Sequence, residues 1–556
     1  MTERVDVCIV GSGFGGSISA WRLAELYRAH GEKPSVLVLE RGVRKGHTDF
    51  RQSMDVDHLS DIYQLVQGQG AQVVIANLVG GGSNLYLAAS LRAPTEIFER
   101  RDHRSDDGPD RRMWPAALSR RTLNPFYHRI ERGLRVRQPS WKEVSRSGGV
   151  WAASLRKAGH TCDRVPVAID FDRCVDAKWC YTGCIFAGKN SLITNYLASA
   201  ERAGVEVRPL VEVQEVQQSN LRPYRYIVKA NNIDPNSKMS SGAATDIECK
   251  VLILAAGAMG TPPILMRSQQ NGYLPSLSGH LGKHLGVNGD HVAAAEYDPQ
   301  KMREILGLRG GVQFFKGKPI TTMSYDWYVG RRDHKFDGTR FNLQEILLSQ
   351  LTNFLYDDGR PPPDGDPSWW GREKKQSIST WSNHIELLAM VEDTSDGTFY
   401  AVPPTGGDFV RPNAGPVGIG LFNYAPSDQS IQVRESANAA MQQVVERAGL
   451  ARFLKLTETP GVYASHPLGG CRMADSADLG VTDDAGAVFG YEGLYCMDSS
   501  LIPTSLSVNP SLTISAVCER AAAGLVRRGE DFGLPRRPKK FKHRTPGVYI
   551  GERRHP

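Results

Sequence analysis

Cysteine, long apolar segments and excess charge are all scarce in this sequence, and each absence excludes a class of protein. Nine cysteines among 556 residues are too few for a scaffold built on disulfides. No uninterrupted apolar run approaches the roughly 18 residues of a membrane-spanning helix. The N-terminus lacks the basic segment, apolar core and small-residue cleavage site of an export signal. We therefore expect a cytoplasmic protein without a transmembrane segment.

Excess charge is confined to the C-terminus. Residues 527–556 hold ten Lys or Arg and three Asp or Glu, a difference that equals the whole net charge of +7. A nucleic-acid-binding protein is expected to spread basic side chains over a folded face, so no nucleic-acid partner is predicted. We expect the tail, residues 529–556, to be solvated. Peripheral contact with a membrane surface, a partner or a second subunit is the alternative.

The chain contains no repeat of fixed period, and short β-branched runs alternate with helical stretches, which indicates an interrupted α/β core. Residues 5–11 and 35–42 have the pattern of buried strands, and residues 17–30 between them carry apolar side chains at helical spacing. This pattern predicts a βαβ unit. Its sheet is expected to resume in three later strands at 205–213, 224–230 and 249–257.

Later segments indicate a second domain. Strand-like runs between residues 375 and 434, such as 384–392, suggest an antiparallel sheet. Residues 355–375 have the Pro and Gly content of a long loop, which suggests either a lid or a plain surface excursion. In a lid, Trp369 and Trp370 could cover an apolar ligand.

The segment Gly11-Ser12-Gly13-Phe14-Gly15-Gly16 is a dinucleotide-binding motif in its informative position, between a strand and a helix. Its glycines allow a tight turn, close approach of the backbone to a pyrophosphate, and close helix–strand packing. The helix N-terminus then faces the phosphates. Glu40, 24 residues after Gly16, ends the next strand. Its carboxylate can accept hydrogen bonds from both ribose hydroxyls and would repel the 2′-phosphate of NADP.

Three further segments are expected to meet at the same cofactor. A glycine run at 80–84 follows an apolar stretch, residues 255–257 end a strand in a glycine turn, and residues 493–498 place Asp498 at a strand end. Together with the first motif they favour FAD over NAD.

Five ordered motifs resemble those of the glucose-methanol-choline (GMC) FAD-dependent oxidoreductases, and the C-terminal one resembles the cholesterol oxidase branch. They are residues 11–16 with Glu40, 79–84, 254–265, 466–473 and 497–523. The resemblance implies a Rossmann-like FAD-binding domain (GMC or p-hydroxybenzoate hydroxylase-like) with an inserted α+β substrate domain on an antiparallel sheet. His103, the histidine nearest to the position of covalent flavin attachment, lies outside the matched stretch. We therefore expect noncovalent FAD.

The resemblance also divides the chain and assigns cofactor contacts. Residues 1–50, 70–100, 190–295 and 460–528 would form the FAD-binding domain, residues 51–69, 101–189 and 296–459 the substrate domain and lid, and residues 529–556 the tail. Adenine would lie near Val213, the diphosphate near Gly13 and Ser83, and the ribityl-phosphate region near Asp498. The expected FAD-binding residues are Gly11, Gly13, Phe14, Gly15, Gly16, Glu40, Arg41, Gly81, Gly82, Ser83, Asn84, Val213, Ala256, Gly257, Asp498, Pro510, Ser511 and Leu512.

His466 and Asn509 match the catalytic pair of this family. An alcohol that gives a hydride to flavin N5 must also lose its hydroxyl proton, and histidine is suited to accept it. Asn509 could donate a hydrogen bond to the same oxygen. Cholesterol oxidases of this type also use a glutamate where this chain has residues 380–383, TWSN, so steroid isomerisation is not expected. Glu386 and His384 are nearby, but strand register could turn them away.

Cys174, Cys180 and Cys184 are crowded in sequence. The segment resembles a cysteine-bearing stretch of bacterial dehydrogenases of this family, some of which have been linked to an iron–sulfur cluster. We expect no metal. Free thiols or a local disulfide that shape a loop are favoured, with iron–sulfur and zinc as alternatives.

The sequence therefore predicts oxidation of an alcohol to a ketone or aldehyde, with oxygen or another electron acceptor as partner. A secondary, sterol-like alcohol is the favoured small-molecule substrate. The alternatives are a dehydrogenase for sugar or glycoside hydroxyls, a non-redox lyase on the same scaffold, and an electron-transfer subunit centred on the cysteines.

Overall fold

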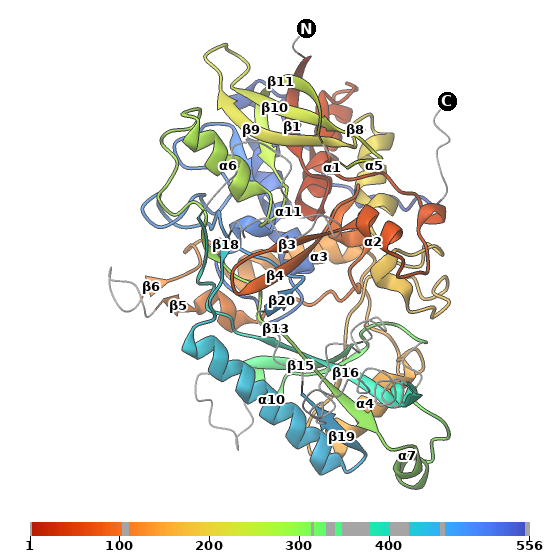
Figure 1. Cartoon of the computed structure of the whole chain (residues 1–556). Coiled ribbons are helices and arrows are strands. Elements are labelled where there is room, and N and C mark those ends of the chain that lie inside the picture. The colour runs from red at the N-terminus through yellow and green to blue at the C-terminus, as the bar shows by residue number, and fades with distance from the viewer. Residues whose placement is uncertain are drawn as a thin grey trace.

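The computed structural model describes residues 3–102, 111–238, 240–312, 316–329, 340–346, 379–400, 422–455 and 462–550. The proposed lid at 355–375 and His103 lie outside these residues. Figure 1 shows two parts: one contains both ends of the chain, and the other is built around β13, β15, β16 and α10.

The first part is built on a seven-stranded sheet of order β8-β2-β1-β11-β10-β9, with β21 also paired to β11. β1, β2, β8, β11 and β21 are parallel, and β9 and β10 are antiparallel. The predicted βαβ unit and the return of the later strands to the same sheet are thus confirmed. The bounds are β1 (Glu3–Val10), β2 (Val36–Leu39), β8 (Glu206–Arg208), β9 (Val211–Gln218), β10 (Tyr226–Ile233), β11 (Ser240–Leu254) and β21 (Leu494–Cys496).

The central strand β1 is buried on both faces, as is usual for a parallel strand covered by helices. Val7 and Ile9 face one core and Cys8 faces another. Helices α1 (Phe14–Arg28), α5 (Tyr196–Arg202) and α11 (Ser511–Arg527) contribute to the first core, and α6 (Thr261–Gln270) to the second. Cys8 and Cys518 are both fully buried.

The second part contains a six-stranded antiparallel sheet of order β19-β13-β16-β15-β14-β7, which confirms the predicted antiparallel sheet. One face packs against α4 (Arg146–Lys157) and α10 (Asp428–Ala448). The other face joins the core of the first part through Val292, Leu388 and Met390. The bounds are β7 (Asp163–Arg164), β13 (Asp290–Tyr297), β14 (Thr322–Ser324), β15 (Phe341–Ile346), β16 (His384–Val391) and β19 (Ala451–Leu454).

At two positions, an element packs in the other part of the molecule than the domain limits expected from sequence would place it. β13 enters the second sheet at Asp290, inside the range 190–295. Helix α3 (Arg120–Gly133), inside the range 101–189, packs on α11, where the Tyr127 hydroxyl lies 2.8 Å from Thr513 Oγ1. The remaining elements are α2 (Val56–Ile62), β3 (Tyr63–Gln67), β4 (Ala71–Ala76), β5 (Arg101–Asp102), β6 (Arg111–Arg112), β12 (Lys283–Leu285), α7 (Pro299–Leu306), α8 (Asp326–Val329), β17 (Gly397–Phe399), β18 (Phe422–Asn423) and β20 (Val462–Ala464).

The C-terminal tail is docked on the chain itself through residue 550. The Tyr549 amide donates to the Thr194 carbonyl at 2.8 Å, and Arg202 lies over the Tyr549 ring. The expectation of a solvated tail is met only by side chains such as Lys539, Lys540 and Lys542, which are exposed. It is wrong for the backbone, because buried groups of α1 bond to it. No helix in the described ranges is long and apolar enough to cross a membrane.

Glu345, on the helix-facing side of β15, is a buried acid. Its Oε1 accepts from the Thr321 amide at 2.8 Å and from the Ser145 hydroxyl at 3.4 Å, while its buried Oε2 has no partner among the described residues. Burial raises the pKa of the Glu345 carboxyl from 4.5 to about 8. The folded protein therefore keeps a proton that the unfolded chain releases above pH 4.5.

Because of this group, the free energy of unfolding should decrease as the pH rises from about 4.5 to about 8. We expect Glu345→Gln to raise the free energy of unfolding by about 1 to 3 kcal/mol at pH 8, with a gain that shrinks toward pH 4.5. Denaturant unfolding at several pH values measures it. Glu304→Gln, at an exposed position, is the control and should show no such trend. A gain of equal size at pH 5 and pH 8 would contradict the prediction.

Candidate active site

The segment that leads into β13 contacts both predicted catalytic regions. Asp290 Oδ1 lies 2.6 Å from Nδ1 of His466. Two residues earlier, Asn288 Nδ2 donates to the carbonyl of Val508, the residue before Asn509, at 2.9 Å. The structure therefore brings His466 and Asn509, which are distant in sequence, to the same end of β13.

Asn288 holds the loop that carries Asn509. It is fully buried, and its Oδ1 accepts from the Leu506 amide at 2.7 Å and from the Ser505 hydroxyl at 3.3 Å. Asn342 of β15 donates from Nδ2 to the Ser507 carbonyl. These contacts fix the backbone before α11 from the turn that leads into β13 and from β15. The buried Oδ1 of Asn509 itself has no hydrogen-bond partner in the described part of the chain.

The glycine-rich segments meet at the carboxyl end of β1. A Cβ added at Gly11 would lie 2.3 Å from the Ala255 carbonyl oxygen, and one at Gly81 would lie 2.9 Å from the Gly13 Cα. Gly11 and Gly81 also have positive φ, so only glycine meets both requirements. The first motif, the run at 80–84 and the turn at 255–257 are thus in contact.

These segments fit a dinucleotide with a flat ring system. Gly13 and Pro510 are the N-cap residues of helices α1 and α11 and form no side-chain cap, which leaves the first amides of both helices available to anionic or polar groups. A Cβ added at Gly13 or Gly82 would have no atom within 4 Å, so the backbone there borders open space. The buried Asn84 Oδ1 also lacks a partner among the described residues.

Glu40 supports the first glycine turn. Its Oε2 accepts from the Ser12 amide at 3.0 Å and the Ser12 hydroxyl at 2.6 Å, and its Oε1 accepts from the Gly42 amide at 2.9 Å. The Ser12 hydroxyl accepts in turn from the Gly80 amide at 2.9 Å. The predicted bonds from Glu40 to ribose hydroxyls remain a prediction.

The expected adenine contacts lie beside Glu40. The Val211 amide of β9 donates to the Glu40 carbonyl at 2.9 Å, which brings Val213 on the same strand near Glu40. Arg41 pairs with Glu212 at 3.6 Å and hydrogen-bonds to Gln64. These contacts place the residues together, and their roles in binding adenine stay predictions.

Asp498 joins two of the converging segments. Its Oδ2 accepts from the Gly257 amide at 2.8 Å and the Thr261 hydroxyl at 2.6 Å, and its Oδ1 accepts from the Ser500 amide at 2.7 Å. Burial raises the pKa of this carboxyl. Its contact with a cofactor remains a prediction.

The start of α11 and the glycine run complete this set of segments. The Ser511 hydroxyl donates to the Ala89 carbonyl at 3.3 Å. Phe14 packs edge-to-face on Tyr86, with ring centroids 5.6 Å apart. The Ser83 hydroxyl donates to the Gly80 carbonyl at 2.7 Å. Other expected FAD-binding residues in these segments are Gly15, Gly16, Ala256 and Leu512.

The cysteine cluster packs beneath the glycine run. Buried Lys189 donates from Nζ to the backbone carbonyls of Asn84, Tyr86 and Cys180, and burial lowers its pKa to about 8. All nine cysteines are free thiols, so no local disulfide is formed. Within the described ranges, no three His, Cys, Asp or Glu side chains are grouped to hold a metal. Cys174, Cys180 and Cys184 therefore gain no support as iron–sulfur ligands.

The register of β16 determines where Glu386 and His384 point. Ile385, Leu387, Ala389 and Val391 face the helices, so Glu386 lies on the other face with Leu388 and Met390. Glu386 interacts electrostatically with Lys178 and Tyr181. Glu386 pairs with Ala294 on β13, whereas Asp290 pairs with Met390. Glu386 is therefore four residues, or about 13 Å, from the position on β16 that lies opposite Asp290. His384 lies at the far end, opposite Glu296.

Sequence reasoning missed Asp290 and Asn288. The only local signal is the Asn-Gly turn in VNGDH directly before an apolar strand, with an acid at its first position. Nothing in that signal connects Asp290 with His466.

The two profiles of the family described as GMC oxidoreductase match residues 7–285 and 421–518. A cholesterol oxidase of Mycobacterium tuberculosis is 26% identical over 98% of this chain and 95% of its own length. A cholesterol oxidase of Acinetobacter baumannii is 26% identical, with 93% of each chain covered.

Solved structures have the same fold. Formate oxidase of Aspergillus oryzae RIB40 superposes with a TM-score of 0.60 at 15% identity, covering 96% of this chain and 99% of the other. Pyridoxine 4-oxidase of Mesorbium loti gives 0.57 at 14% identity, covering 94% and 99%. The chain therefore belongs to the GMC oxidoreductase family and is an FAD-dependent enzyme that oxidises a CH–OH group of its substrate.

Proposed function

We propose that this enzyme oxidises a secondary, hydrophobic alcohol of sterol-like shape, with His466 as the base and Asn509 as the group that orients the hydroxyl. The observation that supports this proposal is that both residues are held near the start of β13. His466 contacts Asp290, and Asn288 donates a hydrogen bond to the residue before Asn509. FAD is expected to bind noncovalently, and oxygen is the proposed acceptor of its electrons.

The residues of this chain supply the proton transfer and the orientation. His466 accepts the hydroxyl proton of the alcohol as the carbinol C–H bond breaks and the C=O bond of the ketone forms. Asn509 donates an amide hydrogen bond to the same oxygen and stabilises its developing negative charge. When bound, FAD supplies the acceptor for the hydride that leaves the carbinol carbon.

The preference for a hydrophobic alcohol rests on two supports. The face of the second sheet that meets the FAD-binding part carries Val292, Leu388 and Met390 beside Asp290. Cholesterol oxidases of Mycobacterium tuberculosis and Acinetobacter baumannii are among the curated relatives, and a long-chain-alcohol oxidase of Arabidopsis thaliana is 24% identical over 92% of this chain and 66% of its own length. No carboxylate stands at residues 380–383, so we propose oxidation without isomerisation.

An anaerobic absorption spectrum tests the proposal. The purified protein is mixed under nitrogen with sterols, long-chain alcohols or glycosides, and air is then admitted. Loss of the flavin absorbance with sterols, followed by its rapid return in air, is the expected result. Loss only with glycosides, or slow return in air, would replace the proposed substrate or acceptor. No loss with any alcohol would overturn the proposed function.

Asn509→Ala should lower kcat by about 10-fold to 100-fold, because the amide stabilises charge that develops on the substrate oxygen. Steady-state turnover of the alcohol identified above measures it, with flavin content as a check on folding. Asn438→Ala, on α10 and bonded to His291, is the control and should leave kcat within about twofold. A normal rate in Asn509→Ala would remove this residue from the mechanism.

A further inference from the structure

We propose that Asp290 is a positioning residue that keeps the proton of His466 on Nδ1 and so leaves Nε2 as the proton acceptor. The catalytic meaning of this inference rests on the proposed function. The tautomer assigned to the His466 imidazole rests only on contacts within the chain.

The hydrogen bond between the two side chains determines the tautomer. Asp290 Oδ1 lies 2.6 Å from His466 Nδ1, and the two side chains are 10% and 23% exposed. An ionised carboxylate can only accept hydrogen bonds, so Nδ1 must carry the hydrogen. In the neutral ring the lone pair then lies on Nε2.

Asp290 is itself held in place. Its Oδ2 accepts from the Ser465 amide at 3.1 Å and the Ser465 hydroxyl at 3.2 Å. The backbone enters β13 through Asn288 and Gly289, both with positive φ, and Asp290 then pairs with Met390. The carboxylate therefore approaches His466 from a fixed turn and a paired strand.

The other ionisable groups near this turn are engaged elsewhere. Asp393 accepts from the Val287 amide at 2.8 Å and from the Tyr424 hydroxyl at 2.6 Å. His291, the next residue along β13, contacts Asn438 of α10. Among the described residues, Asp290 is the charged side chain within ion-pair distance of His466.

The arrangement also serves the proton transfer. The alcohol O–H bond breaks, an N–H bond forms at Nε2, and the imidazolium that results remains paired with the Asp290 carboxylate. An asparagine at 290 could instead donate its amide hydrogen to Nδ1. That would stabilise the tautomer with hydrogen on Nε2, which cannot accept the proton.

Nitrogen NMR of protein labelled with ¹⁵N-histidine tests the tautomer without any substrate. The His466 signals are identified among the 14 histidines by their absence from His466→Gln. We expect the Nδ1–H form in the wild type at a pH where the ring is neutral, and the Nε2–H form in Asp290→Asn. Ser465→Ala, which removes one contact to Asp290 and none to His466, should keep the wild-type pattern.

Kinetics on the same variants supply the second readout. Asp290→Asn should lower kcat by about 10-fold to 100-fold with little change in KM, and Asp290→Glu should recover part of the loss. An Nε2–H signal in the wild type, or the same tautomer in wild type and Asp290→Asn, would overturn the inference. If the NMR signals show the expected tautomers but the protein oxidises no alcohol, the proposed function would be overturned and the contact between Asp290 and His466 would still stand.

Discussion

Turnover of the alcohol should fall by a factor of about 10² to 10⁴ when His466 is replaced by glutamine, while the protein still binds FAD. Glutamine has similar polarity but cannot accept a proton at neutral pH. His466 lies two residues after the short strand β20, with Ser465 and Asp290 around it, so the substitution leaves the glycine segments untouched.

The measurement is single-turnover loss of flavin absorbance under nitrogen, which separates chemistry from substrate binding and product release. His128→Gln is the matched control, because His128 lies exposed on α3 and contacts Arg92 and Glu131. It should react at the wild-type rate. Unchanged single-turnover kinetics in His466→Gln would remove this histidine from the proton transfer.

The parts of the fold that follow from local rules were predictable. The glycine turn, the helix after it and Glu40 lie within one βαβ unit, where turn chemistry and apolar spacing act over a few residues. The helix begins at Phe14, three residues before the predicted Ser17, because Gly13 caps it directly. Periodicity marks the apolar body of a helix better than its first turn.

The parts that depend on distant contacts were not predictable. Asp290 and His466 are 176 residues apart, and a backbone bridge between Gly286 and Leu468 brings the turn before Asp290 to the loop after β20. The orientation of Glu386 was not predictable either. Its face on β16 follows from a register that the apolar run HIELLAMV, buried at every position, does not reveal.

The tail was misjudged for a similar reason. The Pro-rich, basic composition of the tail correctly predicts solvated side chains, but it cannot show which groups the backbone binds. Arg22 Nη1 donates to the Arg544 carbonyl at 2.9 Å, and the Arg544 amide donates to Glu25. The docking site is thus a buried ionic group on α1, which no pattern in the tail itself encodes.

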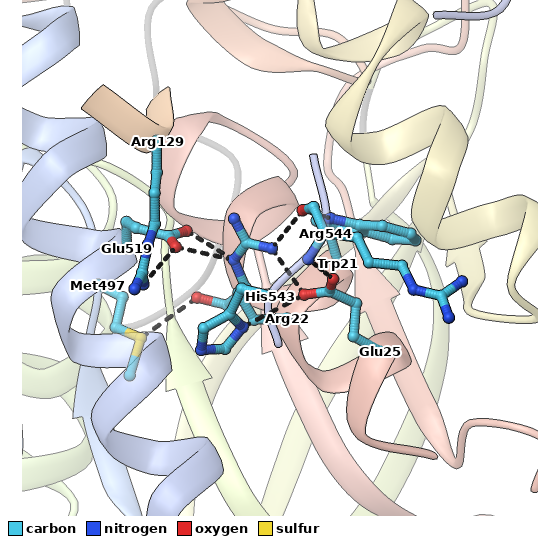
Figure 2. Close-up of polar contacts among 9 residues, drawn as sticks. Trp21, Arg22, Glu25, Arg129, Met497, Glu519, His543 and Arg544 are labelled. Carbon is cyan, nitrogen blue, oxygen red and sulfur yellow. Dashed lines mark hydrogen bonds and ion pairs between the residues drawn. The ribbon is translucent and has the colours of Figure 1, made fainter. Parts of the chain in front are cut away.

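Figure 2 shows the contacts of that ionic group. Arg22 Nε donates to both carboxylate oxygens of Glu519 at 2.9 and 2.8 Å, and Arg22 Nη1 donates to Glu25 at 2.6 Å. The Arg22 and Glu519 side chains are 2% and 0% exposed. The pair joins α1 to α11, and through Arg544 it joins both helices to the tail.

Glu519→Leu should lower the free energy of unfolding by about 3 to 5 kcal/mol, because it leaves the buried Arg22 charge with only part of its compensation. Denaturant unfolding of the FAD-loaded protein measures the loss. Asp531→Asn, which breaks the exposed pair with Arg528, is the control and should change stability by less than about 1 kcal/mol. Adding both Arg22→Met and Glu25→Gln to Glu519→Leu should recover much of the loss, because Arg22 pairs with both carboxylates and none of the three charges is then left buried without its partner. A triple variant as unstable as Glu519→Leu alone would show that packing at α11, rather than the unpaired charge, causes the loss.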